Sequence, residues 1–394
     1  MNIRSSNLRA IWREHGRQMR APSRIAVHWP LGPAVDPRLL LARVEPGLIQ
    51  ILRGLGITLL VSREYEHLLV ALRPEAGRLK TSWLPIPHPS GIAVDRRRRR
   101  IHVASTRNPN VLFEFAPVTG FLARKGEVPP RKMTGVLLPV RSRFLPGCAY
   151  LHDLALVGGV LYGASTGQNA IVELDYERGM KPVWWPKSVE SSSGPLLGEN
   201  RLQLNSIAAG SSLKKSYFTA SNERPGRMVP GDLDYPVEKR GVLVSGFSRA
   251  AVGRGLTRPH SARLYRGKVW VANSGYGELS SLRNGRFQVL ARLPGWTRGL
   301  CLREGIAFVG TSRIIPGYEG YAPGVEPEAS VCGVHAVNLG TGRVLGSIIW
   351  PQGHQIFAVD WMPSPWSPGF PERGGSNEAR SIQTLFYTGV VDPP

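Results

Sequence analysis

The chain has 394 residues, of which 42% are hydrophobic and 20% are charged, and its formal net charge is +22. This content is typical of a folded globular protein and excludes disorder of the whole chain. No apolar stretch approaches the roughly 18 residues of a transmembrane helix, which excludes a membrane span. Cys148, Cys301 and Cys332 are odd in number and contain no CxxC motif. We therefore expect buried thiols in a reducing compartment rather than disulfides.

Residues 1–55 are predicted to form a basic N-terminal extension with one helix. The first twenty residues are rich in arginine but lack the apolar core of a secretory signal, which favours a cytoplasmic protein; an organellar transit peptide is the alternative. Residues 38–54 carry apolar side chains at helical spacing and end in glycine. This pattern predicts a helix that packs on the side of the main domain, the alternative being a partner-binding or membrane helix.

Arginine supplies most of the basic charge and is scattered, apart from the run Arg96–Arg100. That run lies between two alternating apolar segments, GIAVD and IHVAS, where a turn is needed. We interpret it as the solvated tip of a β-hairpin. No nucleic-acid-binding motif accompanies it, so nucleic acid is not a favoured partner.

A repeated pattern organises residues 56–394, which we predict to be one domain. Each copy has a polar residue, an alternating apolar strand, a short turn and a second strand that ends in small hydroxyl or amide residues. The copies begin at Ser90, His152, Asn205, His260, Arg298 and Phe357. Intervals of 38 to 62 residues suit four short antiparallel strands per copy. This arrangement is typical of the blades of a β-propeller.

The two ends of the domain complete the last blade. Residues 57–86 contain three strand-like runs without a first strand, whereas the copy at Phe357 has a first strand, a Pro- and Gly-rich insertion and a resumption at 382–390. Joining them removes exposed sheet edges. The predicted fold is therefore all-β: a six-bladed β-propeller closed by strands from both termini, with a short N-terminal helical extension.

The first residues of the six copies are expected to meet at one mouth of the central channel. His152 and His260, with Asn205 between them, offer two nitrogens and an amide oxygen, a donor set that suits a divalent transition metal such as Zn, Fe, Mn or Cu. Asp153 could join them as a ligand or orient an imidazole. The alternative is a polar channel filled with water.

Catalytic candidates surround the same mouth. Arg298 offers a planar cation for a carboxylate, a phosphate or a developing oxyanion, the alternative being a structural ion pair. Glu278 and Tyr276 follow the second strand of the fourth copy and are candidates for proton transfer, although such residues more often cap loops. Walker, GxGxxG and HExxH motifs are missing, which excludes the common nucleotide-binding and metalloprotease families.

Four blade motifs carry a family resemblance: the pairs His152-Asp153 and Leu204-Asn205, and the triplets Pro259–Ser261 and Arg298–Leu300. With these motifs the chain resembles an uncharacterised bacterial family of conserved hypothetical β-propeller proteins, over about residues 45–365. The resemblance implies the fold and no known activity. Ala358 stands where that family carries an aspartate in its last blade. Looser similarity to gluconolactonase, strictosidine-synthase-like and peptidylglycine amidating lyase propellers implies a metal at the channel mouth.

These features favour a metal-dependent enzyme that acts on a small polar or anionic substrate, or on a modified peptide, with hydrolase, lyase and oxidoreductase chemistry left open. The alternative is a non-catalytic propeller that binds a peptide or a carbohydrate. A third possibility, a binder of anionic polymers, predicts binding that weakens steeply with salt.

Overall fold

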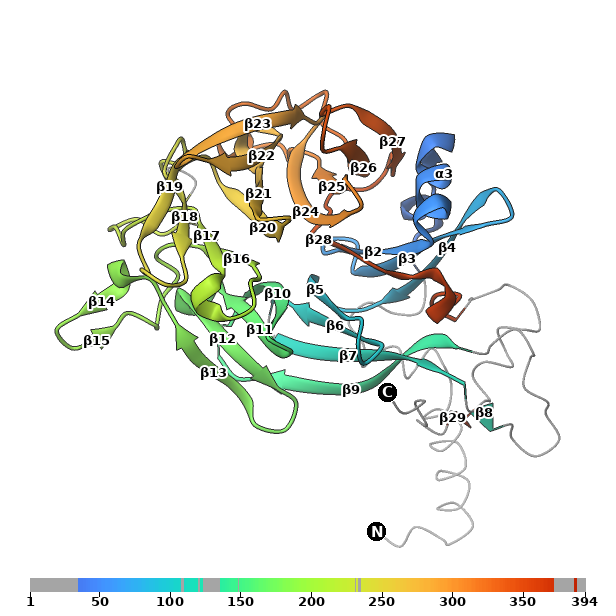
Figure 1. The fold of residues 1–394 in the computed structure, drawn as a ribbon, viewed down its shortest axis with the longest axis horizontal. Coiled ribbons are helices and arrows are strands. Elements are labelled where there is room, and N and C mark those ends of the chain that lie inside the picture. Colours follow the sequence, from blue (N-terminus) through green and yellow to red (C-terminus); the bar gives the residue numbers. More distant parts are fainter. Residues whose placement is uncertain are drawn as a thin grey trace, which may run out of the picture.

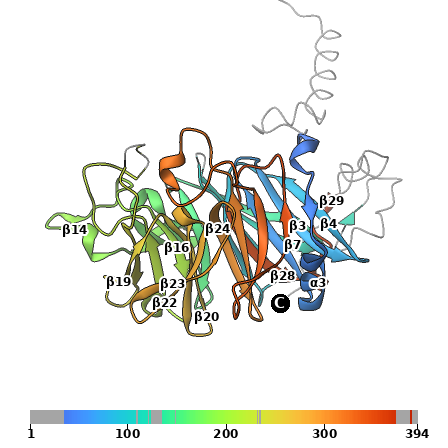
Figure 2. The same cartoon turned by 90° about the horizontal axis from the view of Figure 1, so that it is seen from above.

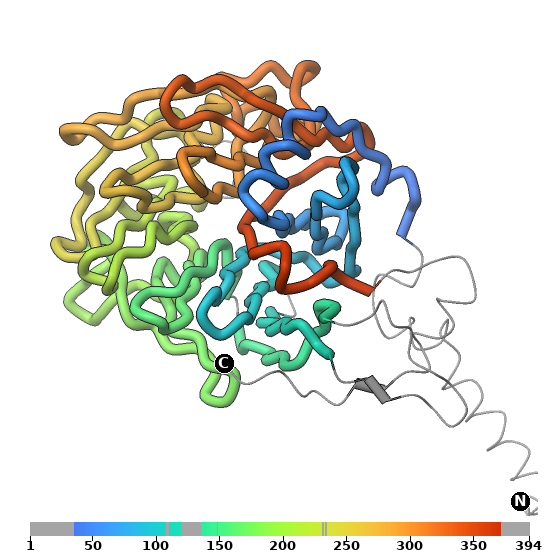
Figure 3. Tube along the Cα trace, turned by 45° about the vertical axis from the view of Figure 1, so that its right-hand side comes forward, coloured from blue at the N-terminus to red at the C-terminus, as the bar shows by residue number. Residues whose placement is uncertain are grey.

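The protein is a six-bladed β-propeller with one α-helix near its N-terminus, as the sequence predicts. The computed structural model describes residues 35–107, 110–119, 121–122, 135–147, 149–230, 232, 235–371 and 386–387. Six antiparallel sheets stand around a central axis, and the chain passes through them in order (Figures 1 and 3). Cys148 lies outside the described residues, and Cys301 and Cys332 are buried free thiols.

Each blade contributes four strands, from the axis outward. The first strands are β5 (Pro89–Asp95), β10 (Leu151–Val157), β16 (Leu204–Ala208), β20 (Pro259–Tyr265), β24 (Trp296–Arg303) and β28 (Ala358–Pro363), which surround the centre of Figure 1. The second strands are β6 (Arg100–Ser105), β11 (Val160–Ser165), β17 (Tyr217–Ala220), β21 (Lys268–Asn273), β25 (Ile306–Ser312) and β2 (Ile57–Arg63). The third strands are β7 (Asn110–Val118), β12 (Ala170–Asp175), β18 (Gly241–Ser245), β22 (Glu278–Arg283), β26 (Gly333–Asn338) and β3 (Leu68–Glu75). The outer strands are β9 (Val136–Leu145), β13 (Gly179–Trp184), β19 (Ala251–Leu256), β23 (Arg286–Arg292), β27 (Val344–Ile349) and β4 (Arg78–Pro85).

Strands from both ends of the domain close the ring. The C-terminal strand β28 pairs with the N-terminal strand β2, with Asp360 opposite Leu60. The predicted resumption of the last copy at 382–390 is wrong for its described part, because β29 (Phe386–Tyr387) pairs with β8 (Phe121–Leu122). The physical reason is that β2 already occupies the edge of β28 where a second strand would pair.

The N-terminal helix is shorter than the predicted segment 38–54. Helix α3 (Pro46–Leu55) begins at a proline and ends at Gly56, which adopts a left-handed conformation with φ 61°. The residues before it form a short 3-10 helix, η2 (Pro37–Leu39), and strand β1 (Arg43–Val44), which pairs with β27. The buried residues Leu48 and Leu52 pack α3 against β27 and β3. Among the described residues, no helix is long and apolar enough to cross a membrane.

Hydroxyl side chains at the ends of second strands join neighbouring blades. Ser62 Oγ donates to the carbonyl oxygen of Ser90 at 2.6 Å, and Thr166 Oγ1 donates to that of Leu204 at 3.0 Å. Ser274 Oγ, next to β21, donates in the same way to the next blade at 2.6 Å. These bonds satisfy buried backbone carbonyls at the blade interfaces. The hydroxyl residues of the sequence repeat therefore stabilise contacts between blades.

The arginine run forms the hairpin turn that the sequence predicts, between β5 and β6. Arg96 pairs with Asp360 at 2.7 Å, Arg98 pairs with Asp95 at 3.3 Å, and Arg100 pairs with Glu114 at 3.2 Å. Three of the five arginines are thus used in ion pairs within the protein, which reduces the free positive charge of this surface.

Candidate functional site

The same strained corner precedes the first strand in four consecutive blades. His88, Tyr150, Gln203 and Arg258 have positive φ angles of 40°, 43°, 50° and 50°, and each lies two residues before the first residue of its copy. Non-glycine residues rarely adopt this conformation, and such strain gathers at functional sites. We call the channel end bordered by these corners the His152 mouth. The six copies of the repeat begin at this end of the channel, at Ser90, His152, Asn205, His260, Arg298 and Phe357.

The two predicted metal-ligating histidines have the same geometry. His152 Nδ1 lies 2.9 Å from the carbonyl oxygen of Tyr150, and His260 Nδ1 lies 2.9 Å from that of Arg258. These contacts require the hydrogen on Nδ1, which leaves each Nε2 as an acceptor. Burial, followed by the charge of Arg298, lowers the pKa of His152 to about 3 and that of His260 well below its usual value. Both imidazoles are therefore neutral near pH 7.

Arg298 is a buried cation beside these imidazoles. Its guanidinium carbon lies 3.3 Å from the ring centroid of Phe357, which also contacts His152 at 5.5 Å between centroids. The residue is 7% exposed, and its Nη2 is buried without a hydrogen-bond partner among the described residues. Burial lowers the pKa of Arg298 to about 10, against the opposing effect of Glu64. An unsatisfied buried donor on a cation is costly unless an anion binds there.

Glu64 is a site residue that the sequence analysis missed. It follows β2 directly and is buried, with Oε1 3.1 Å from Arg107 Nε and 3.7 Å from His88 Nδ1. Burial raises its pKa, but His88, Arg298 and Arg107 outweigh that effect, and the net shift is downward. Two guanidinium groups thus face one carboxylate, which leaves the mouth positively charged. The sequence feature that could have identified Glu64 is its position directly after a second strand. That strand belongs to residues 57–86, the segment that lacks a first strand of its own.

Asn205 and Asp153 are held by neighbouring strands. Asn205 Oδ1 accepts a hydrogen bond from Thr219 at 2.7 Å, and its Nδ2 donates to the carbonyl oxygen of Pro259 at 2.8 Å. Both carboxylate oxygens of Asp153 accept from Arg263, at 2.6 and 3.0 Å, and one also accepts from a backbone N–H of β16 at 3.0 Å. The polar atoms of both side chains therefore already have partners: Asp153 and the amide nitrogen of Asn205 bond to other blades, and the amide oxygen of Asn205 is bonded within its own blade.

The predicted proton-transfer residues lie farther from the axis. Glu278 is on β22, the third strand of its blade, and its carboxylate contacts Asn273 Nδ2 at 2.8 Å and Arg292 Nη2 at 3.1 Å. Tyr276 donates its hydroxyl to Glu238 at 2.7 Å, which raises its pKa. These contacts agree with the loop-capping interpretation of both residues. The structure brings together His152, His260 and Arg298, and leaves Glu278 and Tyr276 outside this group.

The donor set at the mouth is incomplete for a resident metal. Among the described parts of the chain, no three histidine, cysteine or acidic side chains are placed to hold one ion. Catalytic zinc sites use three protein ligands, whereas His152 and His260 supply two. Arg298 also places a fixed positive charge beside both imidazoles and opposes a second cation. The residues present therefore fit an anion better than a resident metal.

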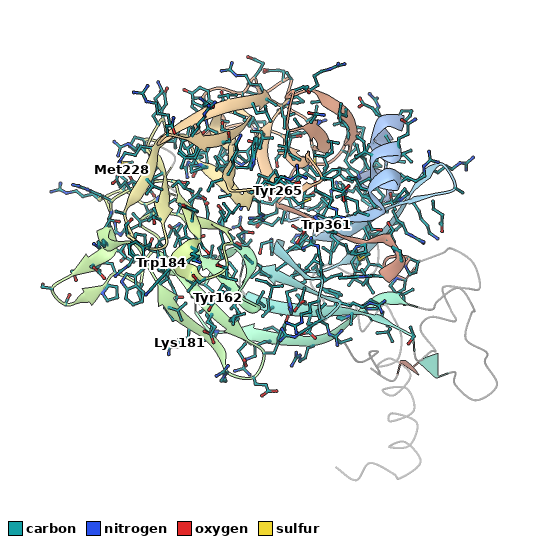
Figure 4. All side chains as sticks on the ribbon, viewed as in Figure 1. Tyr162, Lys181, Trp184, Met228, Tyr265 and Trp361 are labelled. Atoms are coloured by element: carbon teal, nitrogen blue, oxygen red, sulfur yellow. The ribbon has the colours of Figure 1, made fainter. Side chains whose placement is uncertain are left out.

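The opposite end of the channel holds a cavity of about 220 Å³. Tyr265 and Trp361, labelled in Figure 4, line it together with Arg96 and Arg263. Both arginines pair with aspartates at 2.6 to 2.7 Å. We call this end the Trp361 mouth. Because its lining arginines are neutralised within the protein, it has less to offer an anion than the His152 mouth.

Larger clefts lie away from the channel. One, of about 600 Å³, lies beside Pro186 and Pro225, and another, of about 760 Å³, adjoins it at Leu196. In the first cleft Arg249 pairs with Glu190 at 2.5 Å, and Glu223 pairs with an arginine at 2.6 Å. These surface clefts lack the buried, unpartnered cation of the His152 mouth.

Comparison with known proteins places this chain in a family. The family model described as a domain of unknown function, DUF4915, matches residues 46–369. The chain belongs to the DUF4915 family. No curated protein matches this DUF4915 protein. The resemblance to an uncharacterised propeller family is thereby confirmed.

Solved structures are similar to the DUF4915 protein at low sequence identity. A chain from a nidogen/laminin complex has a TM-score of 0.51 at 11% identity, over 78% of this chain and 99% of that one. A gluconolactonase from Xanthomonas campestris has a TM-score of 0.43 at 14% identity, over 68% and 77%. A streptogramin B lyase has a TM-score of 0.36 at 12% identity, over 62% and 69%. These identities carry no residue role to the DUF4915 protein.

Proposed function

We propose that the His152 mouth binds a small anionic substrate and that the protein is an enzyme acting on it. The single observation that carries this proposal is the guanidinium of Arg298, which is buried beside two neutral imidazoles with an unpartnered Nη2. A carboxylate or phosphate would satisfy that donor and balance the charge. The Nε2 atoms of His152 and His260 would accept hydrogen bonds from hydroxyl groups of the same molecule.

The reaction that suits this arrangement is a hydrolase- or lyase-type step. Arg298 would stabilise negative charge that develops on a substrate oxygen, because a fixed cation in a water-poor site is already oriented for it. His152, with a pKa of about 3, is a weak base near pH 7 and serves to orient the substrate. The substrate's own chemistry determines which bond breaks.

Binding of acetate, measured by ligand-observed NMR at constant ionic strength, tests this proposal. Wild type should bind acetate, and Arg298→Met should weaken binding by roughly 10- to 100-fold, since a hydrogen bond to a charged group contributes about 1.5–3 kcal/mol. The matched control is Arg97→Met, which removes the same charge from an exposed turn. Equal binding by wild type and Arg298→Met would overturn the proposal.

Turnover is a separate measurement. Hydrolysis or elimination in a panel of small esters and lactones of hydroxy acids, lost in Arg298→Met, would support the enzyme. Anion binding without any turnover would instead indicate a non-catalytic binding propeller.

A divalent transition metal at the same mouth is the second candidate. The observation in its favour is that both imidazoles are fixed through Nδ1 by backbone carbonyls, as metal-ligating histidines usually are. His152 and His260 would hold the ion and water or substrate would complete its coordination. Elemental analysis of untagged protein tests this candidate: stoichiometric Zn, Fe, Mn or Cu, lost in His152→Ala and His260→Ala, supports it, and metal-free wild type after reconstitution excludes it.

A further inference from the structure

Aromatic rings border the His152 mouth in a continuous arc. Ring centroids are 5.6 Å apart between His260 and Trp296, 6.4 Å between Trp296 and Tyr321, and 5.6 Å between Tyr321 and Tyr318. Tyr65 lies at the same mouth, because it directly follows Glu64, whose carboxylate is 3.1 Å from Arg107 Nε, and it interacts electrostatically with Tyr318. We call Trp296, Tyr321, Tyr318 and Tyr65 the aromatic arc.

Two neighbouring blades build this arc. Tyr65 lies in the turn between β2 and β3, and Tyr318 and Tyr321 lie in the segment between β25 and β26. That orange segment stands above one face of the propeller in Figure 2. The buried guanidinium of Arg258 stacks 3.9 Å from the ring centroid of Tyr321, whose hydroxyl donates to the carbonyl oxygen of Pro230 at 3.2 Å. Tyr321, the middle of the arc, is therefore held in place by these two contacts.

Two rings of the arc are exposed to solvent. Tyr65 is 41% exposed and Tyr318 is 47% exposed. Tyr65 also interacts electrostatically with Arg298 and Arg107. Aromatic faces provide a large apolar contact area with a defined geometry for stacking. A ligand anchored by its charge at Arg298 would thus have its uncharged part next to exposed ring faces.

From this juxtaposition we propose that the ligand of the His152 mouth is a carboxylate attached to a six-membered ring. Its carboxylate binds Arg298, and its ring stacks on Tyr65 and Tyr318. The inference rests on the proposed function, since it takes Arg298 as the anchor. Aromatic acids and sugar acids share the required chemistry, because both carry a carboxylate beside a flat face of carbon and hydrogen.

Affinities for three probes test the inference: acetate, which has no ring, benzoate and glucuronate. Stacking contributes about 0.5–1.5 kcal/mol beyond buried area, so wild type should bind one of the ring compounds roughly 2- to 13-fold more tightly than acetate. Preference for benzoate would identify an aromatic acid, and preference for glucuronate a sugar acid. Tyr65→Ala and Tyr318→Ala should each reduce the affinity for the preferred ring compound more than the affinity for acetate.

The control is Phe247→Ala, which removes a ring that is 77% exposed in the turn between β18 and β19. Tyr318→Leu retains bulk without an aromatic face and should lose the advantage as Tyr318→Ala does. Urea unfolding of each variant verifies that it is folded. Ring compounds that bind no better than acetate, while Arg298→Met abolishes acetate binding, would overturn the inference and leave the proposed function standing. Probes that bind Arg298→Met as tightly as wild type would overturn both.

Discussion

Replacing Arg298 with methionine should stabilise the protein while removing its anion site. A pKa that falls from 12.5 to about 10 means that the folded protein disfavours the charged guanidinium. With 1.36 kcal/mol per pKa unit, that penalty is roughly 3 kcal/mol, and at 7% exposure little of it is screened by water. The variant also loses a cation–π contact with Phe357, about 1 kcal/mol, although methionine still packs on the ring. We expect a net gain of about 1–2 kcal/mol in the free energy of unfolding, since an apolar residue often replaces a buried charge without loss.

Urea unfolding in a buffer free of chloride and carboxylate measures this gain, because added anions would stabilise only the wild type. Acetate should therefore raise the wild-type urea midpoint and leave that of Arg298→Met unchanged. Arg97→Met, the exposed control, should remain within about 0.5 kcal/mol of wild type. If Arg298→Met loses more than about 1 kcal/mol in anion-free buffer, Arg298 is a structural element and the reasoning fails.

Three further predictions concern stability. His152 has a pKa near 6.5 in the unfolded chain and about 3 in the folded protein. The free energy of unfolding should therefore be highest above pH 6.5 and should decline as the pH falls from 6.5 toward 3. His335, with a pKa of about 4, contributes to the same decline. His335→Gln should therefore make the loss of unfolding free energy between pH 6.5 and pH 5 smaller by about 1.5 kcal/mol, which urea titrations at both pH values would measure. Asp153→Asn should cost about 3 kcal/mol in urea unfolding, because it leaves the half-buried Arg263 without its counterion; an unchanged midpoint would contradict the structural role. Gly91→Ala should lower the melting temperature or prevent folding, because its Cβ would lie 2.6 Å from a backbone nitrogen of β10; a wild-type melting curve would refute such tight blade contact.

The architecture could be predicted because each blade repeats a local pattern. Alternating apolar residues and the hydroxyl residues at strand ends mark the strands, and the missing first strand at residues 57–86 indicates the closure between β2 and β28. The helix start was wrong, because the apolar run Leu39–Leu41 suggests a helix that pairing between β1 and β27 prevents. Such pairing is set by a distant strand and leaves no local signal.

The site was harder to predict because partners far apart in the chain determine its roles. Asp153 and Arg263 are 110 residues apart, and Asn205 and Pro259 are 54 apart, so their ion pair and hydrogen bond follow only from the way blades meet. Glu64 follows a second strand whose own segment, residues 57–86, has no first strand to mark the mouth. The first-residue positions did predict that His152, His260 and Arg298 lie near one another, since every copy begins at the same place beside the channel. Their convergence follows from the fold, and the chemistry they perform remains a proposal.

A crystal structure grown with benzoate would test the central claim most directly. We expect density for a carboxylate within hydrogen-bond distance of Arg298 Nη2, with the ring against Tyr65 or Tyr318. Benzoate found only in the clefts beside Pro186 and Pro225, with no ligand at the His152 mouth, would contradict it.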